Sequence, residues 1–316
     1  MPPAAALPAP DFDPVAGLPE LASVRRLAEA GDWPGLRELF GRLTDEHGRC
    51  VAAGIVGEVP GVEQFLAHVV RQDADPLAAT LLANRRIILG WQARTSSRAK
   101  DVTADQWALF REHLNHAEQL LIKVTAHRPD FALAWSARLT VAMGLSLGRS
   151  ESRRRYRRLT AHHPHHFVAQ SRRLQQLLPK WGGTWEEAYA FARECLANAP
   201  DGALSGALLA EYHIERWLDL GRGEKGAEYL RQPHVRAELA DAAHRSVLHP
   251  ACRARYGIVA VHGEFAMATS LAGELPQAAR HFGATGGFAS RFPWDYLPGD
   301  ARANFIEHRE RALAKG

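Results

Sequence analysis

Cysteine, strand signals and long apolar runs are all scarce in this chain of 316 residues. The three cysteines, Cys50, Cys195 and Cys252, are far apart and odd in number, which argues against a disulfide framework and favours a reducing cytoplasm. Charges interrupt every apolar run before the roughly 18–20 residues that span a bilayer, so we predict no membrane partner and a cytoplasmic location. The first residues lack a basic segment and contain several prolines, which predicts a flexible leader and not a secretory signal.

Signatures of several common enzyme classes are also missing. There is no His-Glu-x-x-His zinc helix, no Gly-x4-Gly-Lys-Ser/Thr phosphate loop, and no Gly-x-Gly-x-x-Gly after a predicted strand. The carboxylate-x-x-His spacing of di-iron bundles occurs at Asp241–His244, and one such pair is not a site. We therefore predict no cofactor.

Apolar and charged residues are present in the proportions of a folded protein. Hydrophobic residues make up 46% of the chain, and 39 basic residues nearly balance 35 acidic ones. A chain of this length and composition can bury a sizeable core. The small net charge of +4 gives no sign of a nucleic-acid partner.

Two segments are near copies of each other at an offset of 35 positions: 124–139 (VTAHRPDFALAWSARL) and 159–174 (LTAHHPHHFVAQSRRL). A period in the mid-thirties is the length of a helix–turn–helix unit, which must stack on neighbours to bury its apolar face. Apolar residues recur every three or four positions, and prolines at 129, 164 and 200 end helices at the same spacing.

A second pattern combines a glycine cap with a close helix crossing. It occurs as Gly31-x4-Leu36-x3-Phe40, Gly221-x4-Gly226-x3-Leu230 and Gly273-x4-Ala278-x3-Phe282. The first glycine is predicted to end a helix in the left-handed conformation. The next helix then places a small or modest residue at the crossing and a large apolar residue one turn later. Thr184 is predicted to cap a further helix, with Glu187 as its capping-box partner.

These patterns resemble the tetratricopeptide repeat, in which a small residue of the second helix is followed four residues later by a bulky one. Ala117, Leu121 and Pro129 match that repeat, as do Ala278 and Phe282. The aromatic residue and glycine of its first helix are missing from most units, so the repeats are degenerate. The chain is also similar, in LLPKWGGTWEEAYAFAR and GGFASRFPWDYL, to an uncharacterised bacterial family of tetratricopeptide-like proteins. The resemblance implies an all-α fold, a right-handed α-solenoid of stacked helical hairpins.

The predicted organisation has four parts. They are a disordered leader (1–15), N-terminal helical hairpins (16–98), tetratricopeptide-like repeats (99–298) and a C-terminal capping helix (299–316). A polar stretch at Arg94–Asp101 marks the predicted break between the second and third parts.

Histidines cluster at 162–166 (HHPHH). His-rich tracts bind zinc, nickel or copper, and His162 with His166 is the pair that would face one ion. Pro164 disfavours the helical turn that this pair needs. The competing interpretation is an ordinary turn between repeats, in which His162 takes the place of His127.

The run Arg153–Arg158 (RRRYRR) is predicted to be a solvated helix with Tyr156 facing inward. A nucleic-acid surface is the less favoured alternative.

Arginine recurs at the same place in the two copies, as Arg138 and Arg173. Both belong to the first helix of a hairpin, which lines the concave groove of tetratricopeptide arrays. Guanidinium groups spaced by one repeat match the carboxylates of an acidic peptide. This series of equivalent arginines stops at Leu209 in the third unit, and exposed helix-face charges are the competing interpretation.

Trp181, in a Lys-Trp-Gly-Gly loop, is a predicted exposed contact. The full set of predicted partner-binding residues is Arg138, Arg172, Arg173, Glu211, His213, Arg216 and Trp181.

The predicted function is therefore a non-catalytic adaptor that binds a protein or peptide, with an acidic segment as one option, in a concave groove. The alternative is a metal-dependent enzyme or metal sensor that uses the clustered histidines. The sequence leaves the partner and the oligomeric state open.

Overall fold

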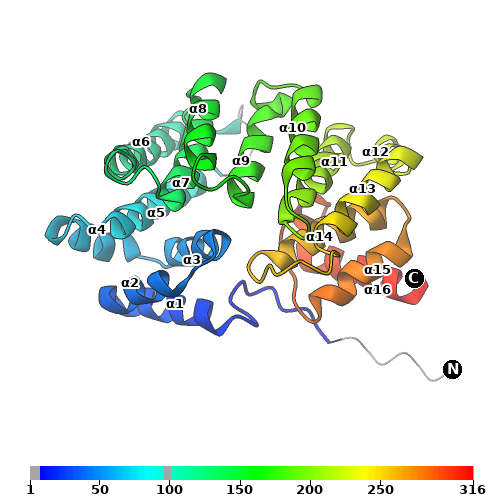
Figure 1. Cartoon of the computed structure of the whole chain (residues 1–316), viewed down its shortest axis with the longest axis horizontal. Helices are drawn as coiled ribbons and strands as arrows, with labels where there is room; N and C mark the ends of the chain where they lie inside the picture. Colours follow the sequence, from blue (N-terminus) through cyan, green and yellow to red (C-terminus); the bar gives the residue numbers. More distant parts are fainter. Residues whose placement is uncertain (1–7, 96–100, 316) are drawn as a thin grey trace. The chain divides into compact units, whose positions relative to one another are not determined.

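The computed structural model describes residues 8–95 and 101–315, and over these ranges the protein is all-α (Figure 1). Its only extended pairing in these ranges is an isolated bridge between Asp11 and Phe288. Two compact units are present. One comprises Leu18–Ala188, and the other comprises the chain from Tyr189 onward together with the residues up to Gly17. We refer to them as the 18–188 unit and the C-terminal unit.

The 18–188 unit is a succession of helices that pack mainly on neighbours one or two places away in the chain. Its helices are α1 (Pro19–Ala30), α2 (Trp33–Arg42), α3 (Glu46–Glu58), α4 (Val62–Gln72), α5 (Pro76–Arg94), α6 (Ala104–His127), α7 (Ala132–Gly144), α8 (Arg149–Thr160), α9 (Phe167–Leu177) and the short 3-10 helix η2 (Pro179–Trp181). Contacts also link α1 to α3, α3 to α5, α5 to α7 and α7 to α9. The odd-numbered helices therefore form a continuous inner layer.

A single apolar core joins α5, α6 and α7. Ala83 and Ile87 of α5 pack with Phe110 and Leu114 of α6, and Ala134 of α7 belongs to the same cluster. This packing crosses the position expected to separate 16–98 from 99–298. That boundary does not coincide with a division between compact units, because the apolar faces on its two sides are buried against each other. Residues 96–100, within the predicted Arg94–Asp101 break, lie outside the described residues.

Helix α10 (Trp185–Asn198) contains the boundary between the two units. The other helices of the C-terminal unit are η3 (Leu204–Gly206), α11 (Ala207–Asp219), α12 (Glu224–Leu230), α13 (Pro233–Arg245), α14 (Ile258–Leu271), α15 (Leu275–Thr285), η4 (Trp294–Tyr296) and α16 (Ala301–Lys315). The apolar helix α14 is central, because it contacts α11, α12, α13, α15 and α16. The predicted C-terminal helix is confirmed as α16.

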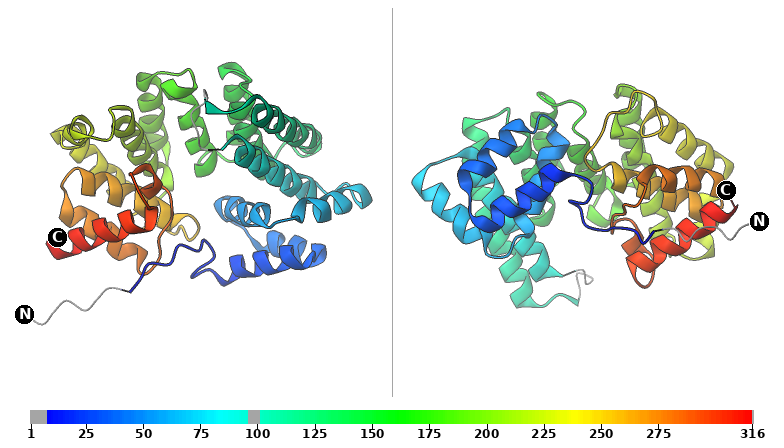
Figure 2. Two further views of the ribbon diagram at one scale, coloured as in Figure 1. Left: turned by 180° about the vertical axis from the view of Figure 1, so that it is seen from behind. Right: turned by 90° about the horizontal axis from the view of Figure 1, so that it is seen from below.

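The expectation of a disordered leader over 1–15 is wrong for residues 8–15, while residues 1–7 lie outside the described part. The segment runs beside the C-terminal helices (Figure 2). The backbone of Asp11 donates to Gly287 and accepts from Ala289, each at 2.8 Å. Arg302 donates to the carbonyl of Pro10, and the ring of Phe12 packs edge-on against a phenylalanine of α16. Composition alone did not reveal these pairings, because they join residues nearly 300 positions apart.

Local signals at helix ends were predicted correctly. Helices α6, α8 and α10 end just before the prolines at 129, 164 and 200. Gly31, Gly221 and Gly273 all have positive φ angles, of 66°, 99° and 81°. Thr184 caps α10 by accepting the amide of Glu187 at 3.2 Å, but the predicted return bond of a capping box is not found, because Glu187 Oε1 bonds Arg149 and its Oε2 has no hydrogen-bond partner in the described residues.

Among the described helices, none is by itself long and apolar enough to cross a membrane. The helices α3 and α4 meet the length and composition criteria only as a pair, with a bend of 114° between them.

Gly226 tests the predicted close crossing of α11 and α12. A β-carbon there would lie 2.6 Å from Cδ1 of the buried Trp217. We expect Gly226→Ala to lower the free energy of unfolding by about 1–3 kcal/mol through overpacking, measured by urea denaturation. Gly283 in α15 has no neighbour within 4 Å, so the control Gly283→Ala should stabilise by about 0.5–1 kcal/mol. Equal effects of the two substitutions would contradict a tight crossing.

Candidate functional site

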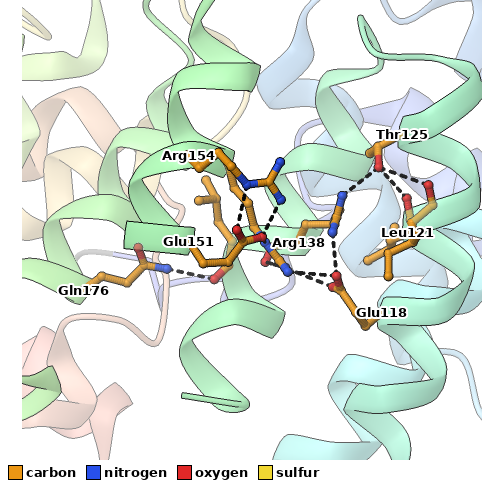
Figure 3. Close-up of polar contacts among 10 residues, drawn as sticks. Glu118, Leu121, Thr125, Arg138, Glu151, Arg154 and Gln176 are labelled. Carbon is orange, nitrogen blue, oxygen red and sulfur yellow. Dashed lines mark hydrogen bonds and ion pairs between the residues drawn. The ribbon is translucent and has the colours of Figure 1, made fainter. Parts of the chain in front are cut away.

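A network of buried charges joins three helices of the 18–188 unit (Figure 3). Glu118 of α6 lies at its centre. Arg138 of α7 donates to Glu118 Oε1 at 2.6 Å and to the Thr125 hydroxyl at 2.9 Å. Arg155 of α8 donates to both Glu118 oxygens, at 2.8 and 2.9 Å, and to the carbonyl of Arg138. Arg155 also bonds Glu151, whose other partner is an arginine one position earlier in α8.

This network is a structural bridge between hairpins. Arg138 is only 7% exposed and Arg155 only 2%. Burial lowers the pKa of Arg138, whereas its bond to Glu118 opposes that shift. The expectation that Arg138 presents its guanidinium on an open surface is wrong, because Thr125 and Glu118 bond its Nη1 and Nη2, its Nε is buried without a hydrogen-bond partner, and the Trp135 ring covers one face at 5.1 Å.

The second arginine of the predicted series has different surroundings. Arg173 of α9 is also 7% exposed, but no ion pair reaches it among the described residues, and its Nη1 has no hydrogen-bond partner. Arg172, beside it in the sequence, is exposed. Trp181 of η2 is half-buried, with its ring edge-on to Trp91 at 6.4 Å. Of these three predicted contacts, only Arg172 is fully open.

The two histidines proposed as metal ligands lie in different environments. His162 is exposed, whereas His166 is buried and its Nδ1 accepts the amide of Ala169 at 3.1 Å, which caps α9. The other ring nitrogen of His166 lies 3.9 Å from Cys50 Sγ. In the described part of the chain, no three His, Cys, Asp or Glu side chains are placed to hold one metal ion.

The remaining predicted residues belong to α11 of the C-terminal unit. Glu211 and His213 are buried, and the half-buried Arg216 bonds Asp219 at 3.1 Å. They belong to a different unit from Arg138, Arg172, Arg173 and Trp181.

His213 is part of a hydrogen-bonded chain that sequence reasoning did not find. Its Nε2 lies 2.9 Å from Glu238 Oε2 and its Nδ1 lies 2.7 Å from the Tyr229 hydroxyl. Tyr189 donates to the other oxygen of Glu238 at 2.7 Å. Burial lowers the pKa of His213 and raises that of Tyr229. A neutral His213 that donates to Glu238 and accepts from Tyr229 satisfies all these groups. This series of hydrogen bonds therefore holds α11, α12 and α13 together.

Two motif-like spacings have ordinary structural roles. Gly144–Gly148 reads Gly-x-Ser-x-Gly, and its Ser146 has φ = 53°, as the serine of a nucleophile elbow does. Here the serine follows a helix, and the amide of Leu147 bonds the carbonyl of Ala142, which closes the end of α7. No histidine or carboxylate bonds the Ser146 hydroxyl in the described residues. Gly221–Gly226 reads Gly-x-Gly-x-x-Gly, but it joins α11 to α12 and no strand precedes it.

A pocket of about 310 Å³ lies beside Glu238 in the C-terminal unit. Helix α11 contributes Leu209, and the flanking helices contribute charges of both signs. The lining residues are Arg193, Glu194, Leu196, Ala197, Leu209, Glu238, Asp241 and Arg245.

A larger pocket, of about 440 Å³, lies in the 18–188 unit where the N-terminal ends of α3, α5 and α7 meet. It combines apolar side chains with arginines, and we call it the α7 pocket. Its lining is Arg37, Phe40, Gly41, Glu46, Arg49, Leu77, Arg128, Asp130, Phe131, Ala132, Leu133 and His163. Asp45 caps α3 and Asp75 caps α5, whereas no side chain caps α7. The helix dipole therefore places partial positive charge at the start of α7, beside the paired Arg128 and Asp130.

No family model, curated protein or solved structure gives a significant match to this chain.

Glu118 is the test of the buried network. Glu118→Gln leaves the buried Arg138 without its counter-charge and Arg155 with Glu151 alone, so we expect the free energy of unfolding to fall by about 3–5 kcal/mol in urea denaturation. Glu112→Gln, on the exposed face of the same helix, should change it by less than about 0.5 kcal/mol. Similar small losses in both variants would show that the network contributes little.

Acid should destabilise the fold through buried histidines. Burial lowers the pKa of several of them, and four have large shifts: His166, His262 and His308 to about 4, and His281 to about 3. Unfolded histidine binds a proton near pH 6.5, as in free peptides. Protons on these histidines therefore favour unfolding as the pH falls from about 6.5 toward 4, and the contribution of these histidines to stability is constant above that window. Thermal unfolding at pH 4–8 measures the effect.

A matched pair of variants tests whether His166 contributes to this dependence of Tm on pH. His166→Asn retains an N-cap for α9 but removes the titrating group, so the dependence of Tm on pH should become shallower. His165→Asn, at the exposed neighbouring position, should leave the slope unchanged. An unaltered slope in His166→Asn would contradict a depressed pKa at this site.

Proposed function

We propose that the protein is a non-catalytic adaptor that binds an acidic peptide segment of a protein partner. We also propose a finer description of the fold. Consecutive helices stack as a right-handed solenoid of degenerate tetratricopeptide-like hairpins, and α16 caps its C-terminal end. The contacts of α1, α3, α5, α7 and α9 with one another support this view, because the first helices of stacked hairpins form such a layer.

The α7 pocket carries the functional proposal. Phe40, Leu77 and Phe131 give it apolar walls, and Arg37 and Arg128 lie at its edge. A peptide ligand with an apolar side chain beside a carboxylate matches these features. The apolar side chain enters the pocket, and the carboxylate binds the arginines and the amides at the start of α7.

The arginines at this site remain available to a partner. Arg128 pairs with Asp130, but both side chains are about half exposed, at 54% and 52%. Exposed pairs of this kind contribute at most about 1 kcal/mol, so exchange for a ligand carboxylate costs little. This differs from Arg138, whose pairing is buried.

Selection of a random displayed peptide library on the full-length protein tests the proposal. We expect enriched peptides to share an apolar residue next to Asp or Glu. Arg128→Glu should weaken their binding by about tenfold or more, equivalent to about 1.4 kcal/mol, in fluorescence anisotropy.

Arg42→Glu is the matched control, because Arg42 is an exposed arginine of α2 outside the pocket lining. It should change the affinity less than twofold. Failure to enrich a consensus, or equal losses in the Arg128 and Arg42 variants, would contradict an adaptor function at the α7 pocket.

A further inference from the structure

The 35-residue offset between the two copies, continued toward their N-terminal side, relates a carboxylate to an arginine. Thirty-five residues after Glu118 and Arg138 stand Arg153 and Arg173. The second copy therefore keeps the buried arginine but replaces its carboxylate partner with another arginine. Both buried arginines have the same exposure, 7%.

As a consequence, Arg173 is a buried cation without a carboxylate partner. In the first copy, Arg138 bonds Glu118 and Thr125. In the second copy, Arg173 Nη1 has no hydrogen-bond partner and no ion pair to this side chain is formed in the described residues. An unpaired buried donor is costly, and a buried charge more so. Such a group in a native structure requires a ligand or another explanation.

The charges around Arg173 are mainly positive. Burial is the largest cause of its lowered pKa, and Arg149 and Arg153 lower it further, whereas Glu187 raises it. Glu187 itself bonds Arg149, and its second oxygen is buried without a hydrogen-bond partner. Three guanidinium groups therefore interact electrostatically with one another and with one carboxylate, which leaves an excess of two positive charges.

Two members of the cluster are open to solvent on α8, whereas Nη1 of Arg173 lies buried. Arg149 has a 47% exposed side chain, and Arg153 is exposed. Arg153 also lines a shallow pocket of about 380 Å³. The rest of that lining, which contains no carboxylate, is Ser150, Arg154, Arg157, Arg158 and Ala161.

We propose that Arg149, Arg153 and Arg173 bind a phosphate group. A phosphate dianion matches the excess of two charges, and its oxygens accept the paired donors of guanidinium groups. The ligand is either free phosphate or a phosphorylated side chain of a partner. This site involves none of the residues that line the α7 pocket, so it does not depend on the proposed adaptor function.

Calorimetric titration of the full-length protein with inorganic phosphate at constant ionic strength is the first test. We expect saturable binding at one site. Phosphate at ten times its Kd should raise Tm by about 3–6 °C relative to chloride at equal ionic strength. Absence of saturable binding, together with no difference from chloride, would overturn the proposal.

Arg153→Glu is the decisive variant, because it restores the acidic residue of the first copy. It should abolish phosphate binding and at the same time raise Tm without phosphate, since the carboxylate introduced at position 153 would pair with Arg173. A merely disruptive substitution would lower both. Arg157→Glu makes the same charge change on the exposed part of α8 and should leave phosphate affinity within about twofold. Equal losses in both variants would show diffuse attraction and refute the site.

Two further measurements complete the design. Glu187→Gln removes the single competing carboxylate, so it should tighten phosphate binding severalfold, and weaker binding would contradict the proposed charge balance.

A comparison of a phosphoserine peptide with inorganic phosphate distinguishes a phosphorylated partner from free phosphate as the ligand. Binding of the peptide that is at least tenfold tighter, and is lost in Arg153→Glu, supports a phosphorylated partner. Equal or weaker binding of the peptide supports the free anion.

Discussion

The requirement that a buried guanidinium be paired governs the packing of the 18–188 unit. Glu118 binds Arg138 and Arg155 together and thereby joins α6, α7 and α8. Removing such charges from water costs several kcal/mol per ion, which is recovered only when the geometry satisfies them. A shift of one helix relative to the others would separate these groups, whereas apolar side chains tolerate small shifts. The network therefore fixes the register of adjacent hairpins more strictly than the surrounding leucines and alanines do.

Between the two copies, the residues that form apolar contacts are retained, whereas a charged residue is not. The residues retained between them include Ala134 and Ala169, Leu139 and Leu174, and the helix-ending prolines, all of which define contacts or helix ends. Apolar contacts in each copy are the same in kind, so the backbone unit is preserved. The acid at position 118 is not preserved, and Arg153 replaces it. The polar position can change in this way because the apolar residues of each copy are retained. The second copy is thus a modified version of a stable structural unit.

Local features of the fold were predictable from the sequence, whereas long-range ones were not. Proline stops, glycine caps and the Thr184 cap depend on residues within one or two turns, and the structure confirms them. The burial of Arg138 was not predicted, because its partner Glu118 lies 20 residues earlier and periodicity does not say which face meets another helix. The α7 pocket was also missed, since its walls come from segments between residues 37 and 163. Of the predicted site residues, Arg173 is the one whose surroundings match an anion site.

The C-terminal unit accommodates buried polar groups in a different way. Its central helix α14 buries His262 and Glu264 among mainly apolar residues. His262 lies 3.0 Å from His281 through the two Nδ1 atoms, an arrangement that needs at least one proton between them and is satisfied by two neutral rings. Burial and the nearby Glu211 raise the pKa of Glu264, which favours its neutral form. These groups are accommodated by neutralisation, whereas Arg138 and Arg155 are accommodated by pairing. When one partner of a buried ion pair is replaced, a net charge remains. No such charge remains where the buried groups are neutral. An unbalanced charge of the kind found at Arg173 is therefore expected in the 18–188 unit and not around α14.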